Sequence, residues 1–249
     1  MKFTLPQQLV FYVLFLIPMY VMADVIRVAV ASNFSQPARE IAARYEQQSG
    51  QQLILSFGST GKHYAQIKHG APFDIFFAAD ARRPRLLEEE GAAIAGSRFT
   101  YARGRLVLWS PREGFVDKQG SILETGKFNR LAMANPKLAP YGKAAQEVLQ
   151  AKGLWHVLRQ RMVHGENISQ TFQFVKSGNA ELGFVAYTQI KWQDQPVTGS
   201  YWLIPQTLYQ PIEQQVILLR DNPAVREFIA YLQGPEAQTI IRAYGYDTQ

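Results

Sequence analysis

Small hydroxyl and amide residues gather in five short segments that each lead into a predicted helix. Three segments follow the first three predicted strands, and two lie in the second half of the chain: 31–35 (ASNFS), 56–61 (SFGSTG), 78–80 (AAD), 139–142 (APYG) and 165–169 (GENIS). A helix start presents unpaired backbone N–H groups and the positive end of the helix dipole, and it binds anions without lysine or arginine. Any one segment is more simply explained as an ordinary helix N-cap. Five together predict an anion site.

Motifs for other chemistry are incomplete or absent. The run from Gly58 to Lys62 has part of a phosphate-binding loop, but Ser56 stands where the pattern needs its first glycine and His63 where it needs Ser or Thr. The four histidines form no close metal-ligand pair, and the chain has no GxSxG segment and no cysteine. An enzyme needs a nucleophile beside a base, and His63 lies past its helix start. We therefore expect no catalytic residue, no directly coordinated metal and no cofactor.

The composition is that of a folded protein with a substantial core. The chain has 249 residues, of which 47% are hydrophobic and 18% charged, so disorder is excluded as its main state. The formal net charge of +6 comes from 26 Lys and Arg against 20 Asp and Glu. These cations are spread along the chain and form no basic stripe interleaved with aromatics. We expect a solvated basic surface and no nucleic-acid partner.

The first 23 residues have the layout of a secretory signal peptide. Lys2 precedes an uncharged apolar stretch of 13 residues, 9–21, and Val21 and Ala23 supply small side chains before Asp24. A membrane span needs ~20 apolar residues, and Pro18 interrupts this shorter stretch. We expect cleavage near Ala23–Asp24 and export of a soluble product.

Strand-like and helix-like runs alternate along the rest of the chain. The predicted strands are 25–31, 53–57, 74–78, 106–109, 131–134, 162–163, 182–186, 201–204 and 214–219. The predicted helices are 35–48, 61–69, 84–90, 142–152, 169–177, 223–232 and 235–244. This order predicts parallel sheets with helices on both faces, in two α/β lobes rather than one large sheet. Ligands of such sheets lie at the carboxyl ends of strands, so the anion site is expected between the lobes.

Several of these runs resemble the periplasmic molybdate-binding proteins of bacterial ABC importers, in the type II periplasmic binding protein superfamily. The most specific stretch is 55–80 (LSFGSTGKHYAQIKHGAPFDIFFAAD), and further similarity lies at 28–34, 131–142, 182–186 and 231–245. The resemblance extends in register over nearly all of 25–246. It implies an α/β fold of two lobes, each a mostly parallel sheet flanked by helices, with molybdate or tungstate clamped in the cleft.

The resemblance also implies the lobe boundaries of the chain and its partners. We expect lobe I to comprise 24–102 and 211–249, and lobe II to comprise 103–210, with two crossing strands between them. The implied protein is a periplasmic monomer that is not an enzyme. Its implied partner is the membrane permease of an ABC importer, with the ATPase of that importer.

The same resemblance implies a set of ligand residues, some acting through side chains and others through backbone N–H groups. They are the side chains of Ser32 and Asn33, the hydroxyl of Ser59 or Thr60, the N–H groups of Ala79, Tyr141 and Ile168, and the hydroxyl of Tyr187. The choice between Ser59 and Thr60 stays open because a one-residue shift moves the register. Tyr187 stands one position after the tyrosine that some family members use.

The predicted donors suit an oxyanion that carries no proton. Molybdate is a dianion at neutral pH and only accepts hydrogen bonds, so its site should offer donors and no bare carboxylate. Asp80 and Glu166 are the carboxylates in these segments; we expect Asp80 to cap a helix and Glu166 to lie near a helix start. If either pointed inward, phosphate would be favoured. Sulfate or phosphate binding on the same fold remains an alternative. A second, less favoured alternative is an exported phosphate-handling enzyme.

Overall fold

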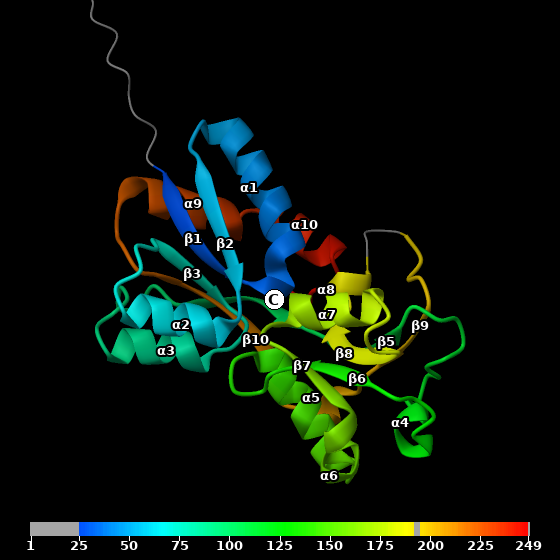
Figure 1. The fold of residues 1–249 in the computed structure, drawn as a ribbon. Coiled ribbons are helices and arrows are strands. Elements are labelled where there is room, and N and C mark those ends of the chain that lie inside the picture. The colour runs from blue at the N-terminus through cyan, green and yellow to red at the C-terminus, as the bar shows by residue number, and fades with distance from the viewer. Residues whose placement is uncertain (1–24, 192–194, 249) are drawn as a thin grey trace, which may run out of the picture.

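The computed structural model describes residues 25–191 and 195–248 of the chain. Figure 1 shows two groups of strands, each covered by helices, with the chain passing between them near the middle of the molecule. The expected signal peptide and its cleavage point before Asp24 lie outside the described residues. Within those residues, no helix is long and apolar enough to cross a membrane.

The first sheet, which defines lobe I, has five strands in the order β2-β1-β3-β10-β4. Their bounds are Ile26–Ala31 (β1), Leu53–Gly58 (β2), Ile75–Ala78 (β3), Phe99–Gly104 (β4) and Ile212–Leu218 (β10). Three helices cover one face and two cover the other. On the first face lie α1 (Ser35–Ser49), α9 (Pro223–Gln233) and α10 (Pro235–Ala243); on the second lie α2 (Thr60–Lys68) and α3 (Arg82–Glu89).

The second sheet, which defines lobe II, has five strands in the order β7-β6-β8-β5-β9. Their bounds are Leu106–Ser110 (β5), Leu131–Ala134 (β6), Met162–Gly165 (β7), Leu182–Ala186 (β8) and Ser200–Leu203 (β9). The helices of this part of the chain are α4 (Ile122–Thr125), α5 (Pro140–Ala151), α6 (Trp155–Leu158), α7 (Ile168–Lys176) and α8 (Tyr187–Ile190). Helices α5 and α7 pack on opposite faces of the sheet.

The sheets are mixed rather than mostly parallel, which corrects one expectation. Strand β1 pairs in parallel with β2 and β3, but β10 pairs antiparallel with β3 and β4. In lobe II, β6 pairs in parallel with β7 and β8, while β5 pairs antiparallel with β8 and β9. A helical crossover forces two neighbouring strands to run in parallel. Strands β5 and β10 enter their sheets from the other lobe, so no such crossover fixes their direction.

Each predicted strand and helix is present within two residues of its expected bounds. Strand β4 was not predicted because Tyr101 and Ala102 are both buried, so its sequence lacks the alternation of a surface strand. The helices α4, α6 and α8 have four residues each and are too short to show a helical period. The 3-10 segments Ser32–Phe34, Arg159–Arg161 and Gln206–Leu208 were missed for the same reason.

Two crossing segments join the lobes. The chain leaves lobe I after Gly104, the last residue of β4, and enters β5 at Leu106; it returns through residues 204–211. The boundary expected between 102 and 103 therefore falls inside β4, and the one expected between 210 and 211 lies just before β10.

Aromatic side chains form the centre of the lobe I core. Phe34 is 1% exposed, and its ring centroid lies 4.9 Å from that of Tyr101, 5.5 Å from that of Tyr246 and 5.7 Å from that of Phe77. Phe34 comes directly after the segment that follows β1, so its burial anchors that segment to the core.

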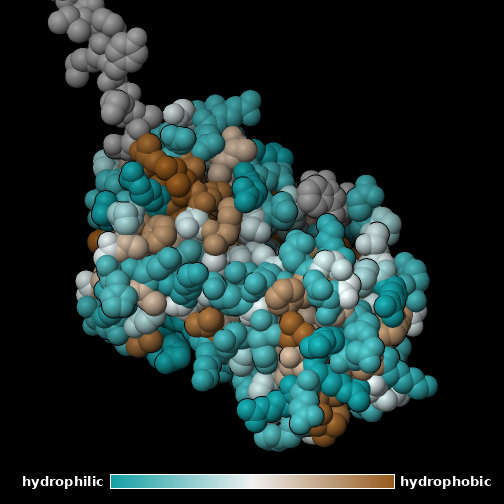
Figure 2. Space-filling model, viewed as in Figure 1, coloured by the Kyte–Doolittle hydropathy of each residue, from teal (hydrophilic) through white to brown (hydrophobic). Residues whose placement is uncertain are grey.

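Replacing Phe34 with Ala should lower the free energy of unfolding by about 3–5 kcal/mol, because it leaves a cavity among three aromatic rings. Urea unfolding of the ligand-free protein measures the change. Ile54→Ala is the control, since Ile54 is 47% exposed on the edge strand β2, where Figure 2 shows apolar colour at the surface of lobe I. It should change stability by no more than about 0.5 kcal/mol. Equal losses in the two variants would contradict this account of the core.

Candidate anion site between the lobes

A small cavity lies between the lobes, at the ends of two strands and the starts of three helices. Strands β1 and β2 are paired in parallel with Ala31 beside Gly58, so their carboxyl ends meet there. The lining residues come from both lobes: Ala31, Ser32, Asn33, Gly58, Ser59, Thr60, Ala139, Pro140, Tyr141, Asn167 and Ile168. None of these residues carries a charged side chain. Any anion bound here would be held by neutral donors.

Three helices begin at residues that line this cavity. Helix α2 begins at Thr60, α5 at Pro140 and α7 at Ile168. The first turn of a helix lacks intrahelical acceptors for its N–H groups. Within the part of the chain that the structure describes, the N–H groups of Thr60, Tyr141 and Ile168 meet no protein acceptor. These groups belong to both lobes, so an anion between them can accept from both.

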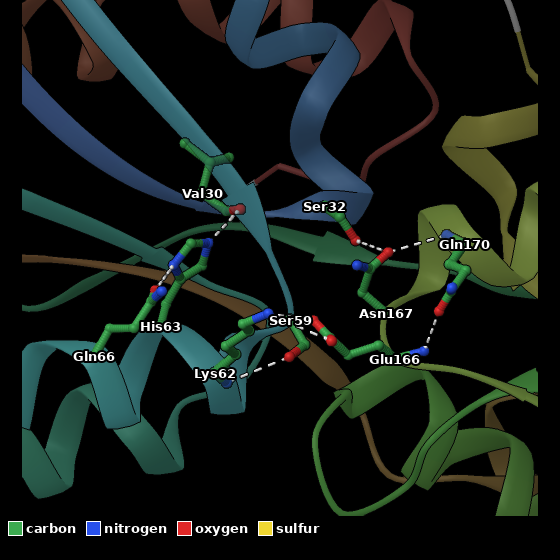
Figure 3. A network of polar contacts seen from close by, with 9 residues as sticks. All are labelled: Val30, Ser32, Ser59, Lys62, His63, Gln66, Glu166, Asn167 and Gln170. Carbon is green, nitrogen blue, oxygen red and sulfur yellow. Dashed lines mark hydrogen bonds and ion pairs between the residues drawn. The ribbon is translucent and has the colours of Figure 1, made fainter.

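Side chains cap neighbouring N–H groups in the same turns. The Ser59 hydroxyl oxygen accepts from the Lys62 N–H at 3.3 Å, and the Asn167 Oδ1 atom accepts from the Gln170 N–H at 3.0 Å (Figure 3). In α5, Pro140 occupies the first position and has no N–H to satisfy. Of the first-turn N–H groups without a protein acceptor, those of Thr60, Tyr141 and Ile168 belong to residues that line the cavity.

Ser59 and Thr60 both reach the cavity as buried hydroxyl residues, 3% and 1% exposed. The Thr60 Oγ1 atom accepts from the Ala79 N–H at 3.1 Å, while the Ser59 Oγ atom accepts from Lys62. A hydroxyl that accepts one bond still has its proton to donate. Both hydroxyl groups thus remain candidate donors, although Thr60 is tied more closely to the core of lobe I.

Two of the expected ligand residues are not among those that line the cavity. The N–H of Ala79 is already paired with Thr60. Tyr187 begins α8, where its N–H donates to the Arg105 carbonyl at 2.9 Å and its ring lies 6.1 Å from the Tyr201 ring. The buried hydroxyl at this helix start is that of Thr188, which donates to the Asn33 carbonyl at 3.1 Å.

Asn33 lines the cavity, but its side-chain amide is turned into lobe I. The Nδ2 atom donates to the Gln214 Oε1 atom at 2.7 Å and to the Tyr246 hydroxyl oxygen at 2.8 Å. Both amide hydrogens are therefore used within the protein. The donor that Asn33 can offer a ligand is its backbone N–H.

Ser32 bonds across the cleft to the start of α7. Its hydroxyl donates to Asn167 Oδ1 at 3.3 Å (Figure 3). The Ser169 hydroxyl in turn donates to the Ser32 carbonyl at 3.1 Å. Sequence reasoning did not single out Asn167 as a site residue. An asparagine with glutamine three positions later, here Gln170, is a helix-capping pattern that could have identified it.

Further contacts hold the lobes together around the cavity. The Gly61 N–H donates to the Leu138 carbonyl at 2.9 Å, and an Arg83 guanidinium N–H donates to the Lys137 carbonyl at 3.0 Å. The Lys62 ammonium and the Glu166 carboxylate form an ion pair at 3.1 Å. The structure thus has its lobes closed on each other.

The two carboxylates of the candidate segments do not line the cavity. Asp80 accepts from the Arg83 N–H at 2.8 Å and pairs with the Arg83 guanidinium, so it serves the first turn of α3. Glu166 is engaged with Lys62 at the mouth of the cleft. Neither offers an acceptor to a bound oxyanion.

His63, just after the candidate segment 56–61, does not line the cavity. His63 faces the Val30 carbonyl at 3.2 Å and the Gln66 side chain at 3.1 Å (Figure 3), and burial lowers its pKa. The described residues contain no group of three or more His, Cys, Asp or Glu side chains placed to hold a metal ion. The chemistry available at the cavity is therefore hydrogen-bond donation.

Comparison with known proteins confirms the resemblance drawn from the sequence. A family model of bacterial extracellular solute-binding proteins matches residues 26–247. The chain is 49% identical to the molybdate-binding protein ModA of Azotobacter vinelandii over 90% of each chain, and 46% identical to that of Rhodobacter capsulatus over 89% of this chain and 87% of the other. A solved structure of the Azotobacter vinelandii periplasmic molybdate-binding protein matches with a TM-score of 0.87 and 39% identity, covering 90% of this chain and 99% of that one.

Thr60→Val should lower the free energy of unfolding by about 1–3 kcal/mol, because the buried Ala79 N–H loses its acceptor. Thr60→Ser keeps the hydroxyl and is the control. Ser59→Ala, which removes only the cap to Lys62, should cost about 1 kcal/mol. Urea unfolding without ligand compares the three variants, and a Val variant as stable as the Ser variant would show that Thr60 does not hold Ala79.

Proposed function

The chain belongs to the bacterial extracellular solute-binding protein family, and we propose that it captures molybdate, or the closely similar tungstate, in the cavity between its lobes. One observation carries the proposal: helix starts from both lobes line an uncharged cavity, and their N–H groups at Thr60, Tyr141 and Ile168 meet no protein acceptor in the described part of the chain. The relatives at 49% and 46% identity, matched over most of their length, are molybdate-binding proteins, which supports the same ligand here.

The proposed ligand set differs in part from the expected one. It comprises the N–H groups of Asn33, Thr60, Tyr141 and Ile168, together with the hydroxyl groups of Ser59 and Ser32. The Ser32 proton would turn from Asn167 Oδ1, at 3.3 Å, to the anion on binding. Ser59 is preferred over Thr60 because its bond to Lys62, at 3.3 Å, is long, whereas Thr60 is committed to Ala79. Ala79 and Tyr187 are left out, since neither lines the cavity.

The number of donors is consistent with tight binding. About six charge-assisted hydrogen bonds at roughly 1.5–3 kcal/mol each amount to ~9–18 kcal/mol before the costs of ordering and association. A dissociation constant of 1 μM corresponds to about 8 kcal/mol. The upper part of the range exceeds this value of about 8 kcal/mol by several kcal/mol, which leaves room for those costs at a dissociation constant below about 1 μM.

The lack of an acceptor at the cavity favours molybdate over phosphate. Phosphate keeps a proton near neutral pH and needs an acceptor for it. The hydroxyl oxygens of Ser59 and Thr60 already accept backbone N–H bonds, and Asp80 and Glu166 are engaged elsewhere. Sulfate has the charge and acceptor pattern of molybdate, so discrimination between them must come from cavity size.

The role that follows is transport rather than catalysis. His63 faces Val30 and Gln66, and no lining residue is a base. We infer that the chain works in the periplasm as a monomer without a cofactor. It would deliver its anion to the membrane permease of an ABC importer with its ATPase.

Ligand capture is proposed to proceed by hinge closure of the two lobes. The expected division into 24–102 with 211–249 and 103–210 would then move to the end of β4, so that lobe I comprises 24–104 and 211–249 and lobe II comprises 105–210. The two crossing segments lie together at one side of the cleft, and the bonds from Gly61 to Leu138 and from Lys62 to Glu166 span it. Opening would break these bonds and admit the anion.

Titration calorimetry should show one site per chain, with molybdate and tungstate bound tightly and sulfate weakly. The longer Mo–O bonds bring all donors into contact, whereas the smaller sulfate would leave some unsatisfied. Phosphate is the second comparison anion. Equal affinity for sulfate and molybdate would contradict the proposed ligand.

Ile168→Pro should weaken molybdate binding about ten- to a hundredfold, because proline removes one N–H donor to a buried dianion. Proline suits the first position of a helix, and the preceding Asn167 is extended (φ −140°, ψ 173°), so α7 should persist. Ile168→Val keeps the N–H and is the matched control. If the Pro and Val variants bind alike by calorimetry, Ile168 is not a backbone donor.

A further inference from the structure

The C-terminal segment that follows α10 packs against the crossing between the lobes. The Arg103 N–H donates to the Asp247 carbonyl at 2.7 Å, and the Asp247 N–H donates to the Arg103 carbonyl at 3.1 Å. The Asp247 carboxylate also accepts from the Arg105 Nε atom at 2.9 Å, between β4 and β5. Tyr246 stands between this bridge and α10, so its backbone is held on both sides.

The Tyr246 side chain is buried in lobe I, and its hydroxyl bonds to Asn33. The ring centroid lies 5.5 Å from that of Phe34, and the residue is 3% exposed. The hydroxyl oxygen accepts from Asn33 Nδ2 at 2.8 Å, and the hydroxyl donates to the Asn33 carbonyl at 3.0 Å. Asn33 Nδ2 also donates to Gln214 Oε1 at 2.7 Å. Three hydrogen bonds therefore fix the orientation of Asn33, and two of them depend on the Tyr246 hydroxyl.

Lobe II reaches the same pair of residues with two further hydroxyl groups. Thr188, on α8, donates to the Asn33 carbonyl at 3.1 Å. The hydroxyl of Tyr141, on α5, forms a hydrogen bond with that of Tyr246 and has no other hydrogen-bond partner among the described residues. Tyr141 is 1% exposed, so this bond lies in a site closed to water. The Tyr246 hydroxyl thus connects a residue of lobe I with a residue of lobe II.

The two connected residues are also the ones whose backbone N–H groups are proposed to bind the anion from opposite lobes. Asn33 and Tyr141 both line the cavity, whereas Tyr246 does not. Burial raises the pKa of the Tyr246 hydroxyl above its usual value, so the hydroxyl keeps its proton and can donate at any working pH. Binding geometry of this kind depends on hydrogen bonds behind the residues that touch the ligand.

We propose that Tyr246 is a positioning residue of the anion site, which holds Asn33 and Tyr141 in the arrangement that lets their N–H groups meet one anion. The inference rests on the proposed function. Through Asn33, Tyr246 orders the segment after β1 before the ligand arrives, which lowers the ordering cost of binding. Through Tyr141, it adds a bond between the lobes that forms when they close.

Tyr246→Phe separates this role from core packing, because it keeps the ring against Phe34 and removes the hydroxyl. It should weaken molybdate binding about tenfold in calorimetry, since one Asn33 amide hydrogen and the Tyr141 hydroxyl then lack a partner in the closed state. Tyr244→Phe is the matched control. Tyr244 is 4% exposed in the same segment, and its hydroxyl donates to Glu40 at 3.0 Å within lobe I, so its removal should leave the affinity unchanged.

A double substitution tests the bond between the lobes. Tyr141→Phe keeps the backbone N–H, and alone it should weaken binding because the bond to Tyr246 is lost. In the Tyr246→Phe background the same change removes a hydroxyl that would be buried without a partner. The double variant should therefore bind molybdate at least as tightly as Tyr246→Phe. Losses that simply add would show that the two hydroxyl groups do not act together.

Hydrogen exchange in the ligand-free protein tests the hold on Asn33 without any anion. Amides of the segment 32–35 should exchange several-fold faster in Tyr246→Phe than in the parent protein, and at the parent rate in Tyr244→Phe. Mass spectrometry of peptides from this segment measures the rates. Equal rates in all three proteins would contradict the positioning role.

The binding results separate the inference from the function on which it rests. A parent protein that does not bind molybdate contradicts the proposed function, and the exchange rates then still decide whether Tyr246 positions Asn33. A parent that binds, with a Tyr246→Phe variant that binds equally well or a Tyr244→Phe variant that is weakened as much, overturns the inference and leaves the proposed function standing.

Discussion

Backbone N–H groups at three helix starts are the constraint on which the arrangement between the lobes depends. A buried N–H group needs an acceptor, and the groups of Thr60, Tyr141 and Ile168 have none within the described protein. Their positions on both sides of the cleft mean that one tetrahedral anion can satisfy groups from each lobe. The same closure of the lobes therefore buries the site and captures the ligand.

The rest of the structure positions these helix starts. The parallel pairing of β1 and β2 brings two strand ends together, and the bond from Ala79 to Thr60 fixes the start of α2. Gly142 lets α5 approach the end of β6, since an added Cβ would lie only 2.2 Å from the Ala134 carbonyl oxygen. Each of these features lies in the chain within a few residues of one that lines the cavity. A site without charged side chains then selects its anion by donor geometry.

The sequence predicts the site best where local rules decide the outcome. The segments that contain Thr60, Tyr141 and Ile168 could be selected because helix starts follow from capping residues and proline, which are visible in short segments. The individual residues came from the resemblance to molybdate-binding proteins, and Thr60 was expected to act through its hydroxyl. The direction of the Asn33 side chain could not be predicted, because its partners Gln214 and Tyr246 are 181 and 213 residues away. Nothing local to Tyr187 indicates that its ring turns toward Tyr201. The mixed sheets were missed for the related reason that β5 and β10 are placed by long-range pairing.

The most direct test of the central claim is a crystal structure of the protein grown with molybdate, with molybdenum located by its anomalous scattering. The account predicts one peak between the lobes, with oxyanion oxygens within hydrogen-bond distance of the N–H groups of Thr60, Tyr141 and Ile168. It also predicts no cation or charged side chain against the anion. A peak outside this cavity, or an anion bound by lysine or arginine side chains, would contradict it.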